Sequence, residues 1–224
     1  MTSSLPRTPK SVAAAGALAA VLFATAAAQE PQHLNDPRLA RLDTAARSLV
    51  AVAIDSARAA GLPTEPLVQR ALEGATKDAP GTLIVSAVQR LAADLGRARA
   101  ALGASATSPE LEAGAAALRA GAGPAVLAQL RRSRRQTITV PLAVLTDLVA
   151  SGVPVDSAAA AVLALAASAR DADLIDFRRA VERDIALGAA PTAATAGAAA
   201  GFLAAGADAV HVNAGARDAR PGRP

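Results

Sequence analysis

The sequence has no cysteine, no tryptophan and no tyrosine, and it has only two histidines and three phenylalanines in 224 residues. Without cysteine, no disulfide holds the chain together and no thiolate serves as a nucleophile or a metal ligand. Sugars and bases are usually held against aromatic rings, so sites of that kind lack their main component here. The core must therefore be built from leucine, valine, isoleucine and alanine.

The residues that remain for catalysis are few and scattered. His33 and His211 are far apart in the sequence, and no HExxH motif or paired-histidine site occurs, so no zinc site and no histidine-based triad is indicated. Lys77 has no Ser-x-x-Lys spacing, and Glu73 four residues earlier predicts a surface ion pair with it. We identify no catalytic residue, no metal ligand set and no cofactor motif.

Four acidic residues (Asp171, Asp173, Asp176 and Glu182) match a calcium-binding loop only in part. Counting Asp171 as the first ligand puts Asp173 at the third position and Glu182 at the twelfth, but Asp176 stands where the loop needs glycine. The pattern instead predicts capping of a helix by Asp171 or Asp173.

Residues 1–28 have the pattern of a secretory signal peptide. Arg7 and Lys10 precede an uncharged, mostly apolar run, and Ala26-Ala27-Ala28 is a small-residue cleavage site, so the mature chain is expected to begin at Gln29 in the periplasm or outside the cell. A retained membrane anchor is the alternative, but the run is short and rich in alanine. Without Arg7 and Lys10, 21 basic residues face 19 acidic ones, and this balance does not indicate a specific nucleic-acid binder.

The mature chain shows helical periodicity throughout, which predicts an all-α fold. Asp36-Pro37 is expected to open a first helix that ends at Gly61, and further helices are expected at about 64–77 and 82–102. No alternating apolar run of strand length occurs.

The opening GLPTEPL at 61–67 recurs as GVPVDSA at 152–158, 91 positions later. The same offset pairs Thr82 with Asp173, both expected as N-caps, and a weaker copy opens at Ser108-Pro109. A period near 45 with two helices in each unit predicts a small elongated array of helical hairpins within one domain, 29–206. The expected repeats lie near 61–103, 108–151 and 152–188.

The GLPxEPL opening followed by Glu73-Gly74 and Lys77 resembles exported helical-repeat proteins of high-GC bacteria that have no assigned activity. The resemblance covers about residues 54–102 and, more loosely, 140–188, where Ala164-Leu165 and Ser168 replace the Glu-Gly and the lysine. It implies export and a helical fold, and it assigns no catalytic residue.

Two further segments have features of interaction sites. Arg131, Arg132, Arg134 and Arg135 form the densest charge run and are candidates for binding an anionic partner, although a solvated helix end explains such a run as well. Residues 185–207 carry no charge and contain Gly197 and Gly201 as a GxxxG pair. They are expected to form a last capping helix, with no stable membrane insertion, and 207–224 are expected to be a disordered tail.

These observations favour an exported, non-enzymatic binding or scaffold protein of the bacterial envelope. Its partner would be a protein or an anionic envelope component, contacted through the helical array. Two alternatives stay open: an envelope tether anchored through 185–207, and an enzyme of unrecognised type for which no nucleophile, base and orienting group can be named.

Overall fold

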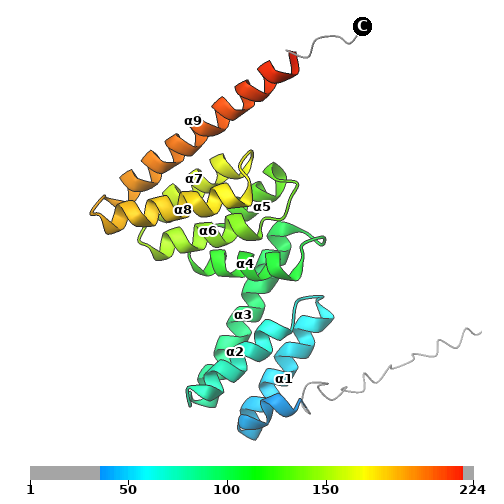
Figure 1. The fold of residues 1–224 in the computed structure, drawn as a ribbon. Coiled ribbons are helices and arrows are strands. Elements are labelled where there is room, and N and C mark those ends of the chain that lie inside the picture. Colours follow the sequence, from blue (N-terminus) through cyan, green and yellow to red (C-terminus); the bar gives the residue numbers. More distant parts are fainter. Residues whose placement is uncertain (1–35, 219–224) are drawn as a thin grey trace, which may run out of the picture. The chain divides into compact units, whose positions relative to one another are not determined.

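The computed structural model describes residues 36–218, with side chains described for residues 36–205. The elements in chain order are η2 (Pro37–Arg41, a 3₁₀ helix), α1 (Thr44–Ala59), α2 (Glu65–Thr76), α3 (Gly81–Leu102), α4 (Ser108–Arg119), α5 (Pro124–Ser133), α6 (Thr139–Ala150), α7 (Val155–Ala166), α8 (Asp171–Ala186) and α9 (Pro191–Asp218). No strand occurs in this part of the chain, so the all-α prediction is confirmed (Figure 1). The expected signal peptide, 1–28, lies outside the described residues.

The expected single helix that begins at Asp36 is wrong, because the chain breaks before α1. The Asp36 side chain accepts a hydrogen bond from the backbone N of Arg38 at 2.9 Å, but the helix that follows is the short η2. Leu42 is extended, and the Asp43 side chain then accepts a hydrogen bond from the backbone N of Ala46 at 2.8 Å to begin α1. Inside a continuous helix Asp43 would lose this cap, which explains the break.

Helices α1, α4, α6 and α8 end in the same way, which explains why the glycine–proline opening recurs. Gly61, Gly121, Gly152 and Gly188 follow them with φ values of 69°, 102°, 89° and 98°. The residue after each glycine donates its backbone N–H to the carbonyl five positions earlier, and a proline follows each glycine within three residues. Glycine adopts positive φ without strain, and proline suits the next first turn. The turn closes the hairpins α1–α2, α4–α5, α6–α7 and α8–α9.

The repeat boundaries expected from the sequence do not coincide with these hairpins. Residues 108–151 hold three helices, α4 to α6, where two were expected. Pro63 and Pro154 precede α2 and α7, and each of these is the second helix of its hairpin. Pro109 instead lies in α4, which is the first helix of the hairpin α4–α5. Helices α4, α6 and α8 begin 31 and 32 residues apart, and not about 45.

Two expected N-caps are also corrected. Helix α3 begins at Gly81, so Thr82 lies within its first turn. Asp173 likewise lies in the first turn of α8, which begins at Asp171. The Asp173 carboxylate accepts a hydrogen bond from the backbone N of Arg170 at 2.9 Å, so it still satisfies a free donor at the helix start.

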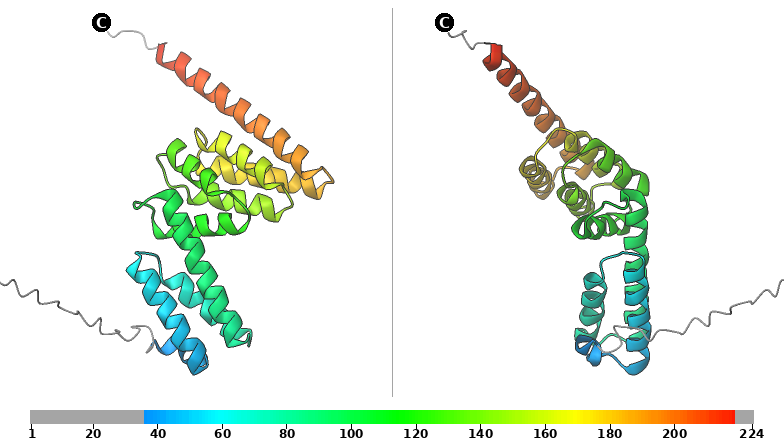
Figure 2. Two further views of the ribbon diagram at one scale, coloured as in Figure 1. Left: turned by 180° about the vertical axis from the view of Figure 1, so that it is seen from behind. Right: turned by 90° about the vertical axis from the view of Figure 1, so that its right-hand side faces the viewer.

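Helix α3 packs against four neighbours along its length, α1 and α2 as well as α4 and α5 (Figure 2). A Cβ on Gly74 of α2 would lie 2.7 Å from Ile84 of α3, and a Cβ on Gly114 of α4 would lie 3.1 Å from the Cβ of Ala98. After α3, the helices α4, α6 and α8 contact one another in turn, and so do α5, α7 and α9. The core between them consists mostly of leucine, valine and alanine, with Phe177 fully buried.

The last helix is longer than the sequence analysis expects. Helix α9 continues through 207–218, which were assigned to the tail, and its alanine-rich composition favours helix. The uncharged segment 185–207 is divided between the end of α8 and the start of α9 by the turn at Gly188. Over the described residues, no helix combines the length and the apolar character needed to cross a membrane.

Candidate functional site

The four arginines of the run at 131–135 do not form one exposed patch. Arg134 is buried, with only 5% of its surface exposed, and the Arg131 side chain is 27% exposed. Arg132 and Arg135 are exposed and form no ion pair with any residue that the structure describes. The run therefore leaves two of its four guanidinium groups for a partner.

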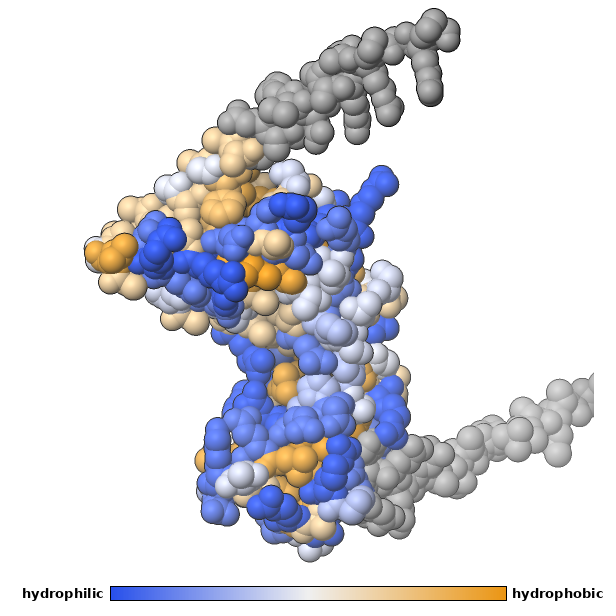
Figure 3. All heavy atoms as spheres, viewed as in Figure 1, coloured by the Kyte–Doolittle hydropathy of each residue, from blue (hydrophilic) through white to orange (hydrophobic). Residues whose placement is uncertain are grey.

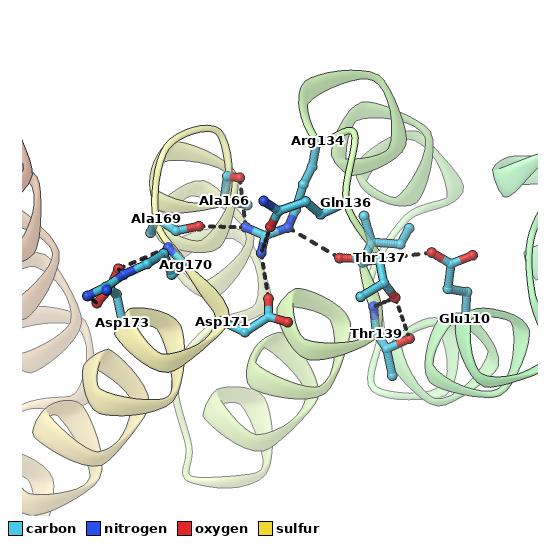
Figure 4. Close-up of polar contacts among 11 residues, drawn as sticks. Glu110, Arg134, Gln136, Thr137, Thr139, Ala166, Ala169, Arg170, Asp171 and Asp173 are labelled. Carbon is cyan, nitrogen blue, oxygen red and sulfur yellow. Dashed lines mark hydrogen bonds and ion pairs between the residues drawn. The ribbon is translucent and has the colours of Figure 1, made fainter.

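Arg134 connects three segments of the fold (Figure 4). Its Nη1 donates to the carbonyl oxygens of Ala166, at 3.1 Å, and Ala169, at 2.7 Å, at the end of α7. Its Nε donates to the Thr137 carbonyl at 3.2 Å, and its Nη2 contacts Gln136 and the Asp171 carboxylate. These acceptors lie in the α5–α6 connection and at the junction of α7 and α8, so Arg134 links these two regions of the fold.

Arg131 has a similar internal role through Glu110, which is 3% exposed. The Glu110 carboxylate accepts hydrogen bonds from the backbone N of Thr107 at 3.0 Å and of Ile138 at 3.1 Å, and it pairs with Arg131. Burial alone raises the pKa of Glu110, but hydrogen bonds from Thr107, Arg131 and Ile138 outweigh it and lower the pKa from 4.5 to about 2. Glu110 is thus an ionised anchor between α4, α5 and the start of α6.

The other residues considered for chemistry have structural explanations. Lys77 Nζ donates to Glu73 Oε1 at 2.7 Å on the exposed surface of α2, which confirms the predicted ion pair. The four acidic residues at 171–182 all lie in α8, and each of them forms an ion pair with an arginine. Within 36–205, no group of three or more histidine, aspartate or glutamate side chains is placed to hold a metal ion. His33 and the His211 side chain lie outside the described residues.

A different set of arginines surrounds a hollow of about 510 Å³ over α3. Arg70 comes from α2, Arg90 and Arg97 from α3, and Arg119 from the end of α4; we call this hollow the arginine groove. Hydrophilic residues cover most of the surface between α2 and α4 on the face shown in Figure 3. The floor of the groove includes Leu91, which is 7% exposed.

One buried carboxylate organises part of the arginine groove. The Asp94 side chain is 7% exposed, and it pairs with Arg97 of its own helix at 2.5 Å and with Arg119 of α4 at 3.8 Å. Arg70 pairs with Glu73 at 3.2 Å, and Arg90 Nη1 donates to the Ser86 hydroxyl at 2.6 Å. The lining of the groove thus holds four guanidinium groups and a single carboxylate. Asp94 restricts the conformations of Arg97 and Arg119, so these side chains lose less conformational entropy when a ligand binds.

A second hollow, of about 620 Å³, adjoins the arginine groove. The two share Arg70, Leu91 and Arg119. The lining of the second also contains three glutamates, which are Glu65 and Glu73 of α2 and Glu112 of α4. We call these three glutamates the carboxylate end.

Sequence reasoning missed the arginine groove because its residues are spread over three helices between positions 70 and 119. The one local signal is on α3, where Arg90, Asp94 and Arg97 follow one another at four- and three-residue steps and so share a helix face. The contributions of α2 and α4 depend on tertiary packing.

No protein-family model, no curated protein and no solved structure matches this chain. Its function is therefore inferred from its own residues.

Proposed function

We propose that the protein is an exported, non-enzymatic binding protein of the bacterial envelope that holds an acidic part of a macromolecular partner in the arginine groove. The observation that carries this proposal is the convergence of Arg70, Arg90, Arg97 and Arg119 from three helices around one hollow that contains a single carboxylate. Guanidinium groups bind carboxylate and phosphate through paired hydrogen bonds, so this lining suits an anionic group.

Contacts between successive helical hairpins support the binding role. Four hairpins close with the same glycine turn, and each hairpin from α4 onward contacts the next through both of its helices. Arrays of this kind present extended surfaces on which residues from successive helices meet. The arginine groove is such a place, because α2 and α4 contribute to it from either side of α3.

Export rests on the sequence of residues 1–28, with two basic residues, an apolar run and a small-residue cleavage site. Export with cleavage implies that the mature chain begins at Gln29. N-terminal sequencing of the protein recovered from the envelope fraction tests this expectation. The absence of cysteine suits an oxidising compartment, because no thiol is open to unwanted pairing there.

The test of the proposed binding uses the double variant Arg70→Gln/Arg90→Gln. Neither arginine contacts Asp94, so the buried ion pairs of the groove are retained. We expect this variant to bind a fluorescent hexaglutamate peptide about tenfold more weakly than the wild type at low salt, since it loses two exposed charge contacts. Wild-type binding should also weaken as salt is added, because salt screens exposed charges.

The matched control is Arg132→Gln/Arg135→Gln, which removes the same charge from the exposed part of the arginine run. It should change hexaglutamate affinity less than twofold. Equal losses of hexaglutamate affinity in the two variants would show nonspecific attraction to net charge. A larger loss in the control would place the anion site at the arginine run of residues 131–135. Circular dichroism and thermal melting confirm that both variants stay folded.

A further inference from the structure

The arginine groove and the adjoining hollow have opposite charge balances. Four guanidinium groups and one carboxylate line the first, whereas three carboxylates and two guanidinium groups line the second. Both arginines of the second hollow, Arg70 and Arg119, are shared with the first. A ligand that extends from one hollow into the other therefore passes from a lining richer in guanidinium groups to one richer in carboxylates.

Two glutamates of the carboxylate end, Glu65 and Glu73, have their pKa lowered by neighbouring residues. The pKa of Glu65 is lowered by hydrogen bonds from Gln69 and then from Arg38, whose Nη1 lies 2.9 Å from Glu65 Oε1. The pKa of Glu73 is lowered by its hydrogen bond from Lys77 and by the nearby charges of Lys77 and Arg70. Both partners of each pair are at the surface, so these carboxylates remain open to further contacts.

This arrangement distinguishes between classes of ligand. Nucleic acids, polyphosphate and anionic polysaccharides carry the same charge on every repeating unit, so the segment that entered the second hollow would meet three carboxylates and only the two guanidinium groups shared with the first. A polypeptide can change the sign of its charge within a few residues. The chain also has no tryptophan or tyrosine on which a base or sugar could stack.

We infer that the arginine groove and the carboxylate end together bind a polypeptide segment of mixed charge, with its acidic residues at Arg90 and Arg97 and its basic residues at the three glutamates. This inference rests on the proposed function and names the partner class for the same site. Arg90 and Arg97 are two helical turns apart on α3, about 10 Å, which three extended residues of a peptide span. The buried side chain of Leu91, common to both hollows, provides an apolar contact between the two charged regions.

Two synthetic octapeptides of equal length test the inference. The first has four glutamates followed by four lysines, and the second has four glutamates followed by four glutamines. A site that recognises only negative charge prefers the second peptide, because its net charge is −4 and that of the first is zero. We expect the opposite order, with the first peptide bound about tenfold more tightly, since several exposed charge pairs form at the carboxylate end.

The variant Glu73→Gln/Glu112→Gln removes two charges from the carboxylate end. It should abolish the preference for the lysine-containing peptide while leaving the affinity for the glutamine-containing peptide equal or higher. A wild-type protein that binds the glutamine-containing peptide or short-chain polyphosphate as tightly as the mixed peptide would overturn the inference of a mixed-charge segment. The anion-binding function would still stand if Arg70→Gln/Arg90→Gln weakened that binding. If Arg70→Gln/Arg90→Gln had no effect on either peptide, the proposed function itself would be overturned, and with it this inference.

Discussion

Replacing Arg134 by alanine should lower the free energy of unfolding by about 3–5 kcal/mol, the range seen when one partner of a buried ionic network is removed. Arg134 is 5% exposed and donates to the carbonyls of Thr137, Ala166 and Ala169, besides pairing with Asp171. Alanine leaves these acceptors without a donor in a site that is largely closed to water. Urea denaturation followed by circular dichroism gives the change.

The matched control for Arg134 is its neighbour Arg135, which is exposed. Arg135→Ala should change stability by less than about 0.5 kcal/mol. Arg134→Lys should rescue little, because a single ammonium group cannot reproduce donors that point in several fixed directions. If Arg134→Ala and Arg135→Ala had equal effects, the buried network would contribute nothing, and the arginine run would be only a solvated helix end.

Replacing Glu110 by glutamine should lower stability at neutral pH by about 3 kcal/mol, because a pKa shift of about 2.5 units corresponds to roughly that free energy. The pKa of Glu110 is about 2 in the folded protein and near 4.5 when unfolded. The ionised carboxylate therefore stabilises the fold fully above about pH 5, and this contribution is lost as the pH falls toward 2. The difference between wild type and Glu110→Gln should shrink over the same interval.

Glu112 provides the comparison for Glu110, since it lies two residues away on α4 and is exposed. Glu112→Gln should leave both the stability and its pH dependence close to those of the wild type. Denaturant titrations at several pH values measure both variants. A difference between wild type and Glu110→Gln that stayed constant down to pH 2 would contradict the assigned role of Glu110, because such a loss would not come from its ionisation.

Local features of the fold could be predicted from the sequence, and features that depend on the wider packing could not. The helix end at Gly61 could be predicted because glycine is the residue that adopts positive φ without strain. The expected repeat boundaries differ from the hairpins for a related reason. Proline occurs at the start of many helices, so Pro63, Pro109 and Pro154 look equivalent in the sequence. In the structure, Pro109 begins the first helix of a hairpin, whereas Pro63 and Pro154 precede second helices.

The candidate site shows the same limit. Arg131 to Arg135 are dense in sequence, but the chain leaves α5 at Arg134 and turns that side chain toward α7 and α8. Arg70 and Arg119 are 49 residues apart and line one groove because α2 and α4 both pack on α3. Nothing in the local sequence around Arg119 indicates the contact that its guanidinium makes with Asp94.

Photo-crosslinking in intact cells tests the central claim, that the arginine groove holds a polypeptide partner. Ala93 is exposed and lines the groove, so benzoylphenylalanine at this position lies beside any bound segment. The control position is Ala172, which is exposed on α8, away from the groove. We predict a crosslinked polypeptide from Ala93, little or none from Ala172, and loss of the Ala93 product in the Arg70→Gln/Arg90→Gln background. Equal products from both positions, or an Ala93 product that survives the double substitution, would contradict the claim.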